Sequence, residues 1–117
     1  MISLSLPFPP STNGLFKNAR RGRVKTDHYT RWITEAGWTL ASQHPPRLSG
    51  RYVLGLTLHP PTRAARDLDN FVKAVSDLLV AHEVIEGDHL AKRIVLEWSD
   101  DPPAKPGSVT ITLEAVT

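Results

Sequence analysis

The stretch "RDLDNFVKAVSD", Arg66–Asp77, places three aspartates on a segment that has the spacing of an amphipathic helix. Its apolar residues, continued to the next turn, recur at helical intervals and predict a stripe that faces a core: Leu68, Phe71, Val72, Val75, Leu78 and Leu79. The polar side of the same helix carries Asp69, Asn70, Lys73 and Asp77. The stretch therefore predicts a helix that is buried on one face and presents carboxylates and an ammonium group on the other.

Patterns on either side of this helix predict a small α/β domain. Alternating apolar and polar residues are typical of half-buried strands, and they occur at residues 2–6, 51–59, 91–99 and 108–116. An earlier helix begins after Thr26, a plausible N-cap, with one apolar face of Tyr29, Ile33, Ala36 and Leu40. The order β-α-β-α-β-β predicts a two-layer α/β sandwich, in which a mixed sheet of about four strands carries both helices.

Length and composition narrow the class of protein. A chain of 117 residues is expected to form one domain, residues 1–117. The absence of cysteine excludes disulfides, thiolate zinc sites and cysteine nucleophiles. No signal peptide, membrane-spanning run, P-loop or Rossmann fingerprint is present. We therefore expect a soluble, cytoplasmic protein with no membrane partner and no small-molecule cofactor.

The charges are unevenly distributed along the chain. Residues 13–51 contain eight basic side chains and two acidic ones, whereas residues 67–101 contain nine acidic and three basic ones. This asymmetry suits a protein that holds a polyanion with one part and a cation with another, although two solvated faces attracting each other would give the same pattern. The segment through Lys25 lacks apolar periodicity and is expected to be a basic loop.

The aspartates allow two interpretations. Asp67 as an N-cap, Asp69 as a complement to the helix dipole and ion pairs with Lys73 would make them structural. Alternatively, Asp67, Asp69 and the later Asp88 converge, which requires Asp67 to lie before the helix proper. Such a carboxylate set suits Mg²⁺ or Mn²⁺ and the hydrolysis of phosphodiesters. Lys73 would then stabilise transition-state charge or help to activate water.

The segments "RDLDNFVKAVSDLL" and "VIEGDHL", with "LPFPPSTN" near the N-terminus, resemble the RusA family of Holliday-junction resolvases. The resemblance implies a small α/β homodimer that cuts four-way DNA junctions with Mg²⁺, in recombination and repair. It also implies the site residues: Asp67, Asp69 and Asp88 for metal binding and catalysis, Lys73 as the essential lysine, and Asn70 and Asp77 in support. A small resolvase of this kind would suit a phage or prophage.

One position departs from the family pattern. Gly87 stands where relatives often have a second acid, and Glu86 is the residue that would compensate for it. Because of this departure, a second hypothesis is a non-catalytic module that binds junctions. A third hypothesis is a nuclease of the same chemistry that acts on flaps or forks.

An acidic site repels DNA, so basic side chains must supply the affinity. The candidates for phosphate contacts are Lys17, Arg20, Arg21, Arg23 and Lys25 in the basic segment, and Arg63 and Arg66 beside the aspartates. Phe16 would stack on an exposed base or plug the core. Because a junction has approximate two-fold symmetry, an isologous dimer with one acidic site per subunit is expected.

Overall fold

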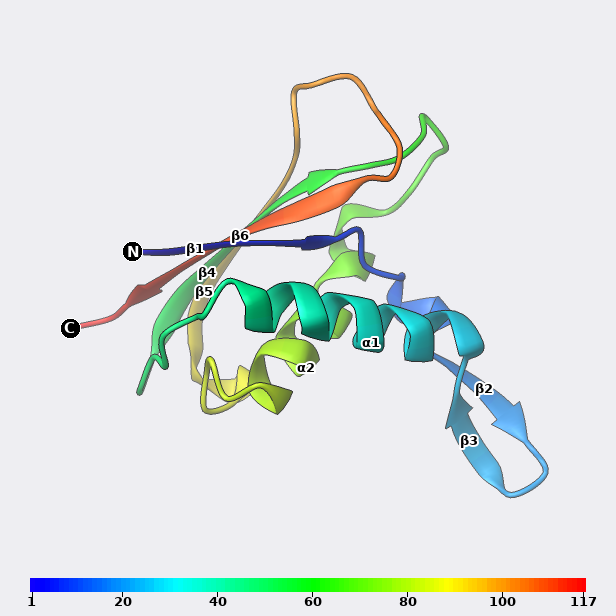
Figure 1. The fold of residues 1–117 in the computed structure, drawn as a ribbon, viewed down its shortest axis with the longest axis horizontal. Coiled ribbons are helices and arrows are strands. Elements are labelled where there is room, and N and C mark those ends of the chain that lie inside the picture. Colours follow the sequence, from blue (N-terminus) through cyan, green and yellow to red (C-terminus); the bar gives the residue numbers. More distant parts are fainter.

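Four strands form one mixed sheet in a computed structural model that describes all of residues 1–117. The strands are β1 (Ile2–Pro7), β4 (Tyr52–His59), β5 (Ala91–Trp98) and β6 (Ser108–Ala115), and their spatial order is β1-β6-β4-β5. β4 pairs in parallel with β5, whereas the pairs β4–β6 and β1–β6 are antiparallel. The sheet is therefore mixed, as the sequence predicts, with β1 and β5 at its edges (Figure 1).

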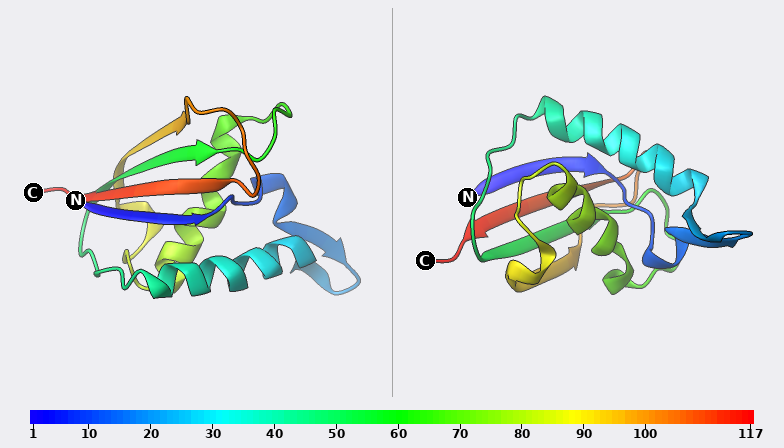
Figure 2. Two further views of the ribbon diagram at one scale, coloured as in Figure 1. Left: turned by 45° about the horizontal axis from the view of Figure 1, so that its top comes forward. Right: turned by 90° about the horizontal axis from the view of Figure 1, so that it is seen from below.

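The alternation of side chains gives the sheet one apolar face. Ile111 of β6 lies opposite Leu4 on one side and Leu56 on the other, and all three are buried. Their neighbours Ser5 and Thr57 point to the other face and remain at least partly exposed. Both helices cover the apolar face (Figure 2), so the predicted two-layer α/β sandwich is confirmed.

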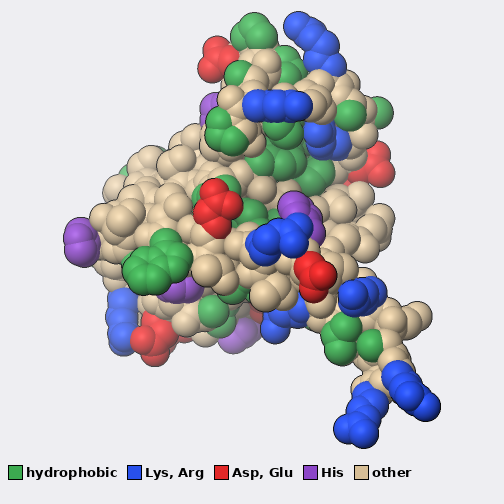
Figure 3. Space-filling model, turned by 45° about the vertical axis from the view of Figure 1, so that its right-hand side comes forward, with side chains coloured by type: hydrophobic (Ala, Val, Ile, Leu, Met, Phe, Trp, Pro, Cys, Tyr) green, Lys and Arg blue, Asp and Glu red, His purple; other side chains and the backbone are tan.

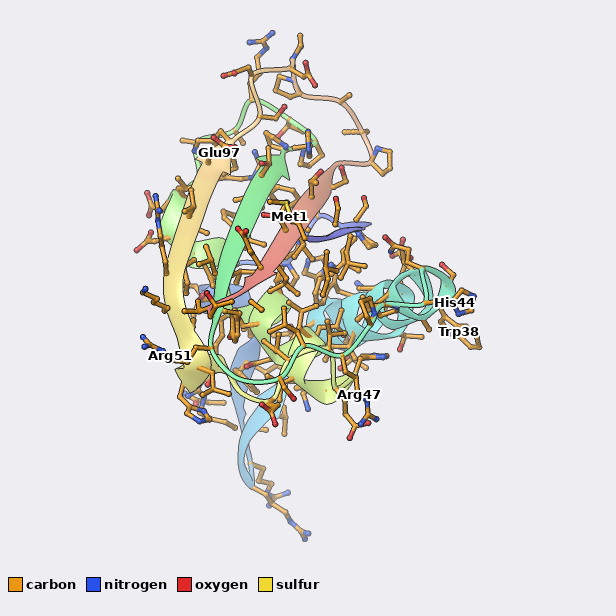
Figure 4. The ribbon with its side chains drawn as sticks, turned by 90° about the vertical axis from the view of Figure 1, so that its left-hand side faces the viewer. Met1, Trp38, His44, Arg47, Arg51 and Glu97 are labelled. Atoms are coloured by element: carbon orange, nitrogen blue, oxygen red, sulfur yellow. The ribbon has the colours of Figure 1, made fainter.

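Helix α1 (Asp27–Ser42) begins where the sequence predicts. The Thr26 hydroxyl accepts a hydrogen bond from the Tyr29 amide at 3.2 Å, so Thr26 is the N-cap. Ala36 and Leu40 are fully buried against the sheet. Trp38, in contrast, is 77% exposed and lies on the outer side of the helix (Figure 4). None of the helices is long and apolar enough to cross a membrane.

The basic segment is not the irregular loop that its composition predicts. It forms an antiparallel hairpin of β2 (Phe16–Ala19) and β3 (Gly22–Lys25), which projects from the body of the domain (Figure 1). Gly22 follows the turn with a φ of 103°, a conformation that glycine adopts without strain. Phe16 lies at the base of the hairpin and packs edge-on against the Tyr29 ring, with centroids 5.9 Å apart. Of its two predicted roles, the structure therefore shows packing against the core.

The second helix is shorter than predicted. A 3₁₀ turn, η2 (Leu68–Phe71), precedes α2 (Lys73–Ala81), so the first aspartates of the quoted stretch lie outside the α-helix. The apolar stripe is nevertheless buried as predicted, with Val75 and Leu79 fully enclosed. Two further 3₁₀ turns, η1 (Thr12–Gly14) and η3 (Asp88–Leu90), lie beside this region and complete the site described below.

Candidate active site

A hollow of about 440 Å³ opens between α2, η1, η3 and the edge strand β5, and we call it the acidic hollow. Its two carboxylates, Asp69 and Asp88, come from η2 and η3, and Lys73 comes from the first turn of α2. Its complete lining is Thr12, Asp69, Val72, Lys73, Ser76, Asp88, His89 and Ile94. Three of the four predicted catalytic residues thus share one hollow, although they span three structural elements.

Asp67 is the exception. Its backbone is extended, with φ of −88° and ψ of 122°, so it lies off the helix as convergence requires. Its carboxylate makes no capping hydrogen bond, and it lines a neighbouring hollow rather than the acidic one. An extended backbone at Asp67 is therefore not sufficient for the three carboxylates to converge. With the 3₁₀ turn that follows it, Asp67 and Asp69 face different hollows.

The neighbouring hollow encloses about 560 Å³, and we call it the aromatic hollow. Phe8 and Phe71 contribute its rings, and Asp67 and Asn70, from the start of η2 and from η2 itself, also line it. The two hollows share a wall because Thr12 Oγ1, in the acidic hollow, donates a hydrogen bond of 3.1 Å to the backbone carbonyl of Asn70. This backbone carbonyl joins η1 to η2, and the supporting role of the Asn70 side chain stays a prediction.

Lys73 is held between two carboxylates. Its Nζ lies 3.1 Å from Asp77 Oδ1, one turn further along α2, and 3.7 Å from Asp88 Oδ2. The hydrogen bond and charge of Asp77, with a smaller contribution from Asp88, raise the pKa of Lys73 above its usual value. Lys73 is therefore a protonated cation at neutral pH, which favours charge stabilisation over activation of water by a neutral amine.

The charges of these side chains also affect the pKa values of two nearby tyrosines, Tyr29 and Tyr52. Burial and then Asp77 raise the pKa of Tyr29, an effect that Lys73 partly offsets. Burial and then Asp88 raise the pKa of Tyr52, whose hydroxyl donates a 3.2 Å hydrogen bond to the carbonyl of Gly87. Tyr52 therefore remains a neutral donor and fixes the turn that carries Asp88.

The glycine that departs from the family pattern is packed against a histidine. A β-carbon on Gly87 would come within 2.5 to 2.6 Å of ring atoms of His89, so this ring occupies the space that a side chain at position 87 would need. Glu86 does not line the acidic hollow, since its Oε1 accepts a 2.6 Å hydrogen bond from the Gly50 amide. His89, and not Glu86, takes the space beside Asp88.

The donor chemistry of the acidic hollow suits a hard cation only in part. Two aspartates and the Ser76 hydroxyl are hard oxygen donors, as Mg²⁺ prefers, and the hollow is open to substrate oxygens. No group of three histidine, aspartate or glutamate side chains is arranged to hold a metal ion. The fitting cation is therefore one that keeps most of its waters and takes few protein ligands.

The predicted DNA-binding residues fall into two groups. Lys17, Arg20, Arg21, Arg23 and Lys25 are exposed on the hairpin, where Figure 3 shows basic side chains at the tip of the projecting arm. Arg23 also lies over the Phe16 ring at 4.9 Å. Arg63 is exposed near Trp98, whereas Arg66 is engaged within the protein.

Sequence reasoning missed two residues of the acidic hollow and underrated a third. Thr12 and Ser76 read as ordinary loop and helix positions, although Ser76 is the single buried polar residue of the core and lines the hollow. His89 attracts attention only as a neighbour of Asp88. The available signal was a serine on the apolar stripe of α2, between Val75 and Leu78.

Together these features define a small α/β domain in which a carboxylate site with a fixed lysine lies near a projecting basic arm. A crossover junction endodeoxyribonuclease RusA of Shigella sonnei is 32% identical over 84 residues, which cover 66% of this chain and 65% of that protein. One of Escherichia coli is 28% identical over 120 residues, which cover 95% and 92%. The sequence profile of the family endodeoxyribonuclease RusA matches residues 7–114. The chain belongs to this family, as its motifs predict.

Proposed function

We propose that this protein is a Mg²⁺-dependent endonuclease that resolves four-way DNA junctions by hydrolysing paired phosphodiesters. The observation that carries the proposal is the meeting of Asp69, Lys73 and Asp88 in one open hollow, although Asp88 comes from a separate turn. Membership of the RusA family supports it, and the two relatives described above bear the name crossover junction endodeoxyribonuclease.

Each side chain has a distinct role in this proposal. Asp69 and Asp88 would hold the Mg²⁺ in the acidic hollow, whereas Asp67 lines the neighbouring hollow. The cation supplies charge neutralisation and a water of lowered pKa. Lys73, kept protonated by Asp77 and Asp88, balances the negative charge that develops on the scissile phosphate. Ser76 and Thr12 line the hollow with neutral hydroxyls.

Affinity for DNA would come from the hairpin. Its five basic side chains carry no acidic neighbour within β2 or β3, and they stand clear of the acidic hollow. Contacts of this kind bind phosphates regardless of sequence and weaken steeply with salt. The chain thereby separates binding, on the arm, from chemistry, in the hollow.

We further propose a homodimer with one acidic hollow per protomer, because two opposed nicks in a two-fold symmetric junction require two sites. Val95 on the edge strand β5, which is 40% exposed, and Trp38 on α1 are apolar surfaces available for such contacts. Sedimentation equilibrium of the purified protein measures the state directly, and a monomer at all concentrations that support cleavage would overturn this part of the proposal.

The test of the activity is product analysis on matched substrates. Purified protein is incubated with a synthetic four-way junction, a flap and a replication fork of shared sequence, each with and without Mg²⁺. We expect two symmetric nicks in the junction, dependent on Mg²⁺, and slow or absent cleavage of the others. Faster cleavage of the flap or the fork than of the junction would show that those structures, and not the junction, are the preferred substrates.

A second candidate function is a non-catalytic module that binds junctions, and two observations favour it. Asp67 lies outside the acidic hollow, and no three acidic or histidine side chains are arranged for a metal ion. Tight binding of the junction with no nick at any concentration of Mg²⁺ or Mn²⁺ would establish this function in place of the first.

A further inference from the structure

From the aromatic hollow we infer a second binding site, which takes one unstacked nucleobase from the branch point of the DNA. This inference rests on the proposed function, because it assigns to a second hollow the recognition of the same substrate. The hollow encloses about 560 Å³, within the roughly 300–1,000 Å³ that is typical of small-molecule sites. Nothing in the chemistry proposed above uses this volume except Asp67 on its wall.

One wall of the hollow is planar and apolar, within a lining that is otherwise mostly polar. Phe8 packs against Phe71 with ring centroids 5.1 Å apart, and the buried Pro9 and Pro10 continue the same wall. Arg66 adds a guanidinium plane, placed 5.6 Å from the centre of the Phe8 ring. Aromatic rings and guanidinium planes are the surfaces on which proteins stack unpaired bases.

The guanidinium of Arg66 is fixed by the protein itself. It donates to the carbonyls of Thr62 and Ala64, both at 3.0 Å, and to the Thr62 hydroxyl at 2.9 Å. A side chain held by three hydrogen bonds of its own loop is preorganised as a surface. Arg66 therefore serves the hollow as a planar wall, in contrast to the free arginines of the hairpin.

The polar groups at the rim suit the edge of a base and disfavour a phosphate. The side-chain amide of Asn70 and the ring of His28 line the hollow, and neither makes a hydrogen bond within the protein. An amide offers both donors and an acceptor, as the edges of bases require. Asp67, in the same hollow, repels a phosphate but not a neutral base.

The position of the hollow explains why its occupant is a base from the branch point. Asn70 separates it from the acidic hollow, so a nucleotide next to the scissile phosphate lies within reach of both. Bases at a branch point lose a stacked neighbour, and extrusion costs least for a base that is already poorly stacked. Occupation of the aromatic hollow would thus favour branched DNA over unbranched DNA and would position the scissile phosphate at the acidic hollow.

The test uses 2-aminopurine, whose fluorescence reports stacking, at each branch-point position of a four-way junction, without divalent cation. We expect binding of the wild-type protein to change the fluorescence at one position or a symmetric pair of positions, and not in the arms. His28→Trp fills the rim of the hollow from an exposed position and should abolish the change. Thr30→Trp, which adds the same bulk to an exposed position of α1 that lines no described hollow, should retain it.

A second variant removes a wall. Phe8→Leu should weaken occupation of the hollow by roughly 5- to 150-fold, the value of one base–aromatic stack, and should lower junction affinity by no more than that factor, because the phosphate contacts remain. An unchanged signal in both His28→Trp and Phe8→Leu would overturn the inference. So would wild-type protein that binds and cleaves junctions with no change at any branch-point position. Failure of cleavage with a normal fluorescence change would instead overturn the proposed function and leave the base site standing.

Discussion

Lys73 and Asp88 form an ion pair, with Nζ and Oδ2 3.7 Å apart, that joins the first turn of α2 to the 3₁₀ turn η3. The contact joins two residues from different elements that no shared helical periodicity relates. Asp77 holds the same ammonium group at 3.1 Å from within the helix. The lysine is thereby kept charged and pointed at the hollow that Asp69 also lines.

Replacing Lys73 by Met should lower the single-turnover rate of junction cleavage by about 10²- to 10³-fold, the usual cost of removing one preorganised group that stabilises transition-state charge. Junction affinity should change little, because the hairpin carries most of the phosphate contacts. Lys105→Met, in an exposed loop away from the hollow, is the matched control. Equal rates for Lys73→Met and the control would remove Lys73 from the mechanism.

The raised pKa of Lys73 also predicts a pH dependence of stability. Because the folded protein binds this proton more tightly than the unfolded chain, the stabilisation is complete below the ordinary pKa of lysine, about 10.4, and is lost as pH rises through the higher folded value. The difference in unfolding free energy between wild type and Lys73→Met should stay constant from about pH 6 to about pH 9 and shrink only above that range. Urea titrations at a series of pH values measure it, and a difference that shrinks near neutral pH would contradict the charge arrangement.

The hairpin prediction concerns the salt dependence of binding. Arg20 and Arg21 occupy the turn between β2 and β3 and make no ion pair, so each is free to contact a phosphate. Arg20→Gln with Arg21→Gln should reduce the slope of log K against log salt by up to about 1.8. Arg47→Gln, which removes an arginine already paired with Glu83, should leave the slope unchanged. An unaltered slope in the double variant would exclude the hairpin tip from the DNA footprint.

The contact between Gly87 and His89 is tested by a double-mutant cycle. A side chain at position 87 must displace the His89 ring, which is exposed and free to move. Gly87→Ala should therefore cost more unfolding free energy in the presence of His89 than in the His89→Ala background, with a coupling of about 0.5–3 kcal/mol. Additive effects in chemical denaturation would show that the ring does not fill this space in solution.

Substitution of Tyr52 tests whether its hydrogen bond to Gly87 stabilises the turn that carries Asp88. Tyr52→Phe removes one of two hydrogen bonds to the buried carbonyl of Gly87 and should destabilise the protein by about 0.5–1.5 kcal/mol, because the Leu90 amide still donates to that carbonyl. Cleavage should fall as well, because Asp88 follows Gly87 directly. Tyr29→Phe, which removes a hydroxyl that makes no hydrogen bond, provides the comparison. Equal stability of the two variants would contradict the role of Tyr52.

The regular elements could be predicted because their signals are local. Thr26 is a cap that depends on its own helix, and the alternation around Ile111 and Leu56 gives the buried face of the sheet. The basic hairpin escaped prediction because charged strands show no apolar alternation, and the turn residues Arg20 and Arg21 give no turn signal apart from Gly22.

The membership of the acidic hollow could be predicted only in part. Asp69 and Lys73 share a polar side, so their proximity follows from spacing. The direction of Asp67 depends on a 3₁₀ turn in place of an α-helical one, and helical periodicity does not distinguish the two. Thr12 enters through a hydrogen bond to Asn70, 58 residues away, which no local pattern reports.

The central claim is that Asp69 and Asp88 form a catalytic site for Mg²⁺ in the acidic hollow. The most direct measurement is cleavage of a synthetic four-way junction by wild-type protein, Asp69→Asn, Asp88→Asn and the control Asp27→Asn, with binding of the uncut junction measured in parallel. Asp27 is exposed in the first turn of α1 and lines neither hollow. We predict Mg²⁺-dependent paired nicks by wild type and control, and loss of cleavage by at least about 10²-fold in the other two with junction binding intact. Full Mg²⁺-dependent cleavage by Asp69→Asn would contradict the account.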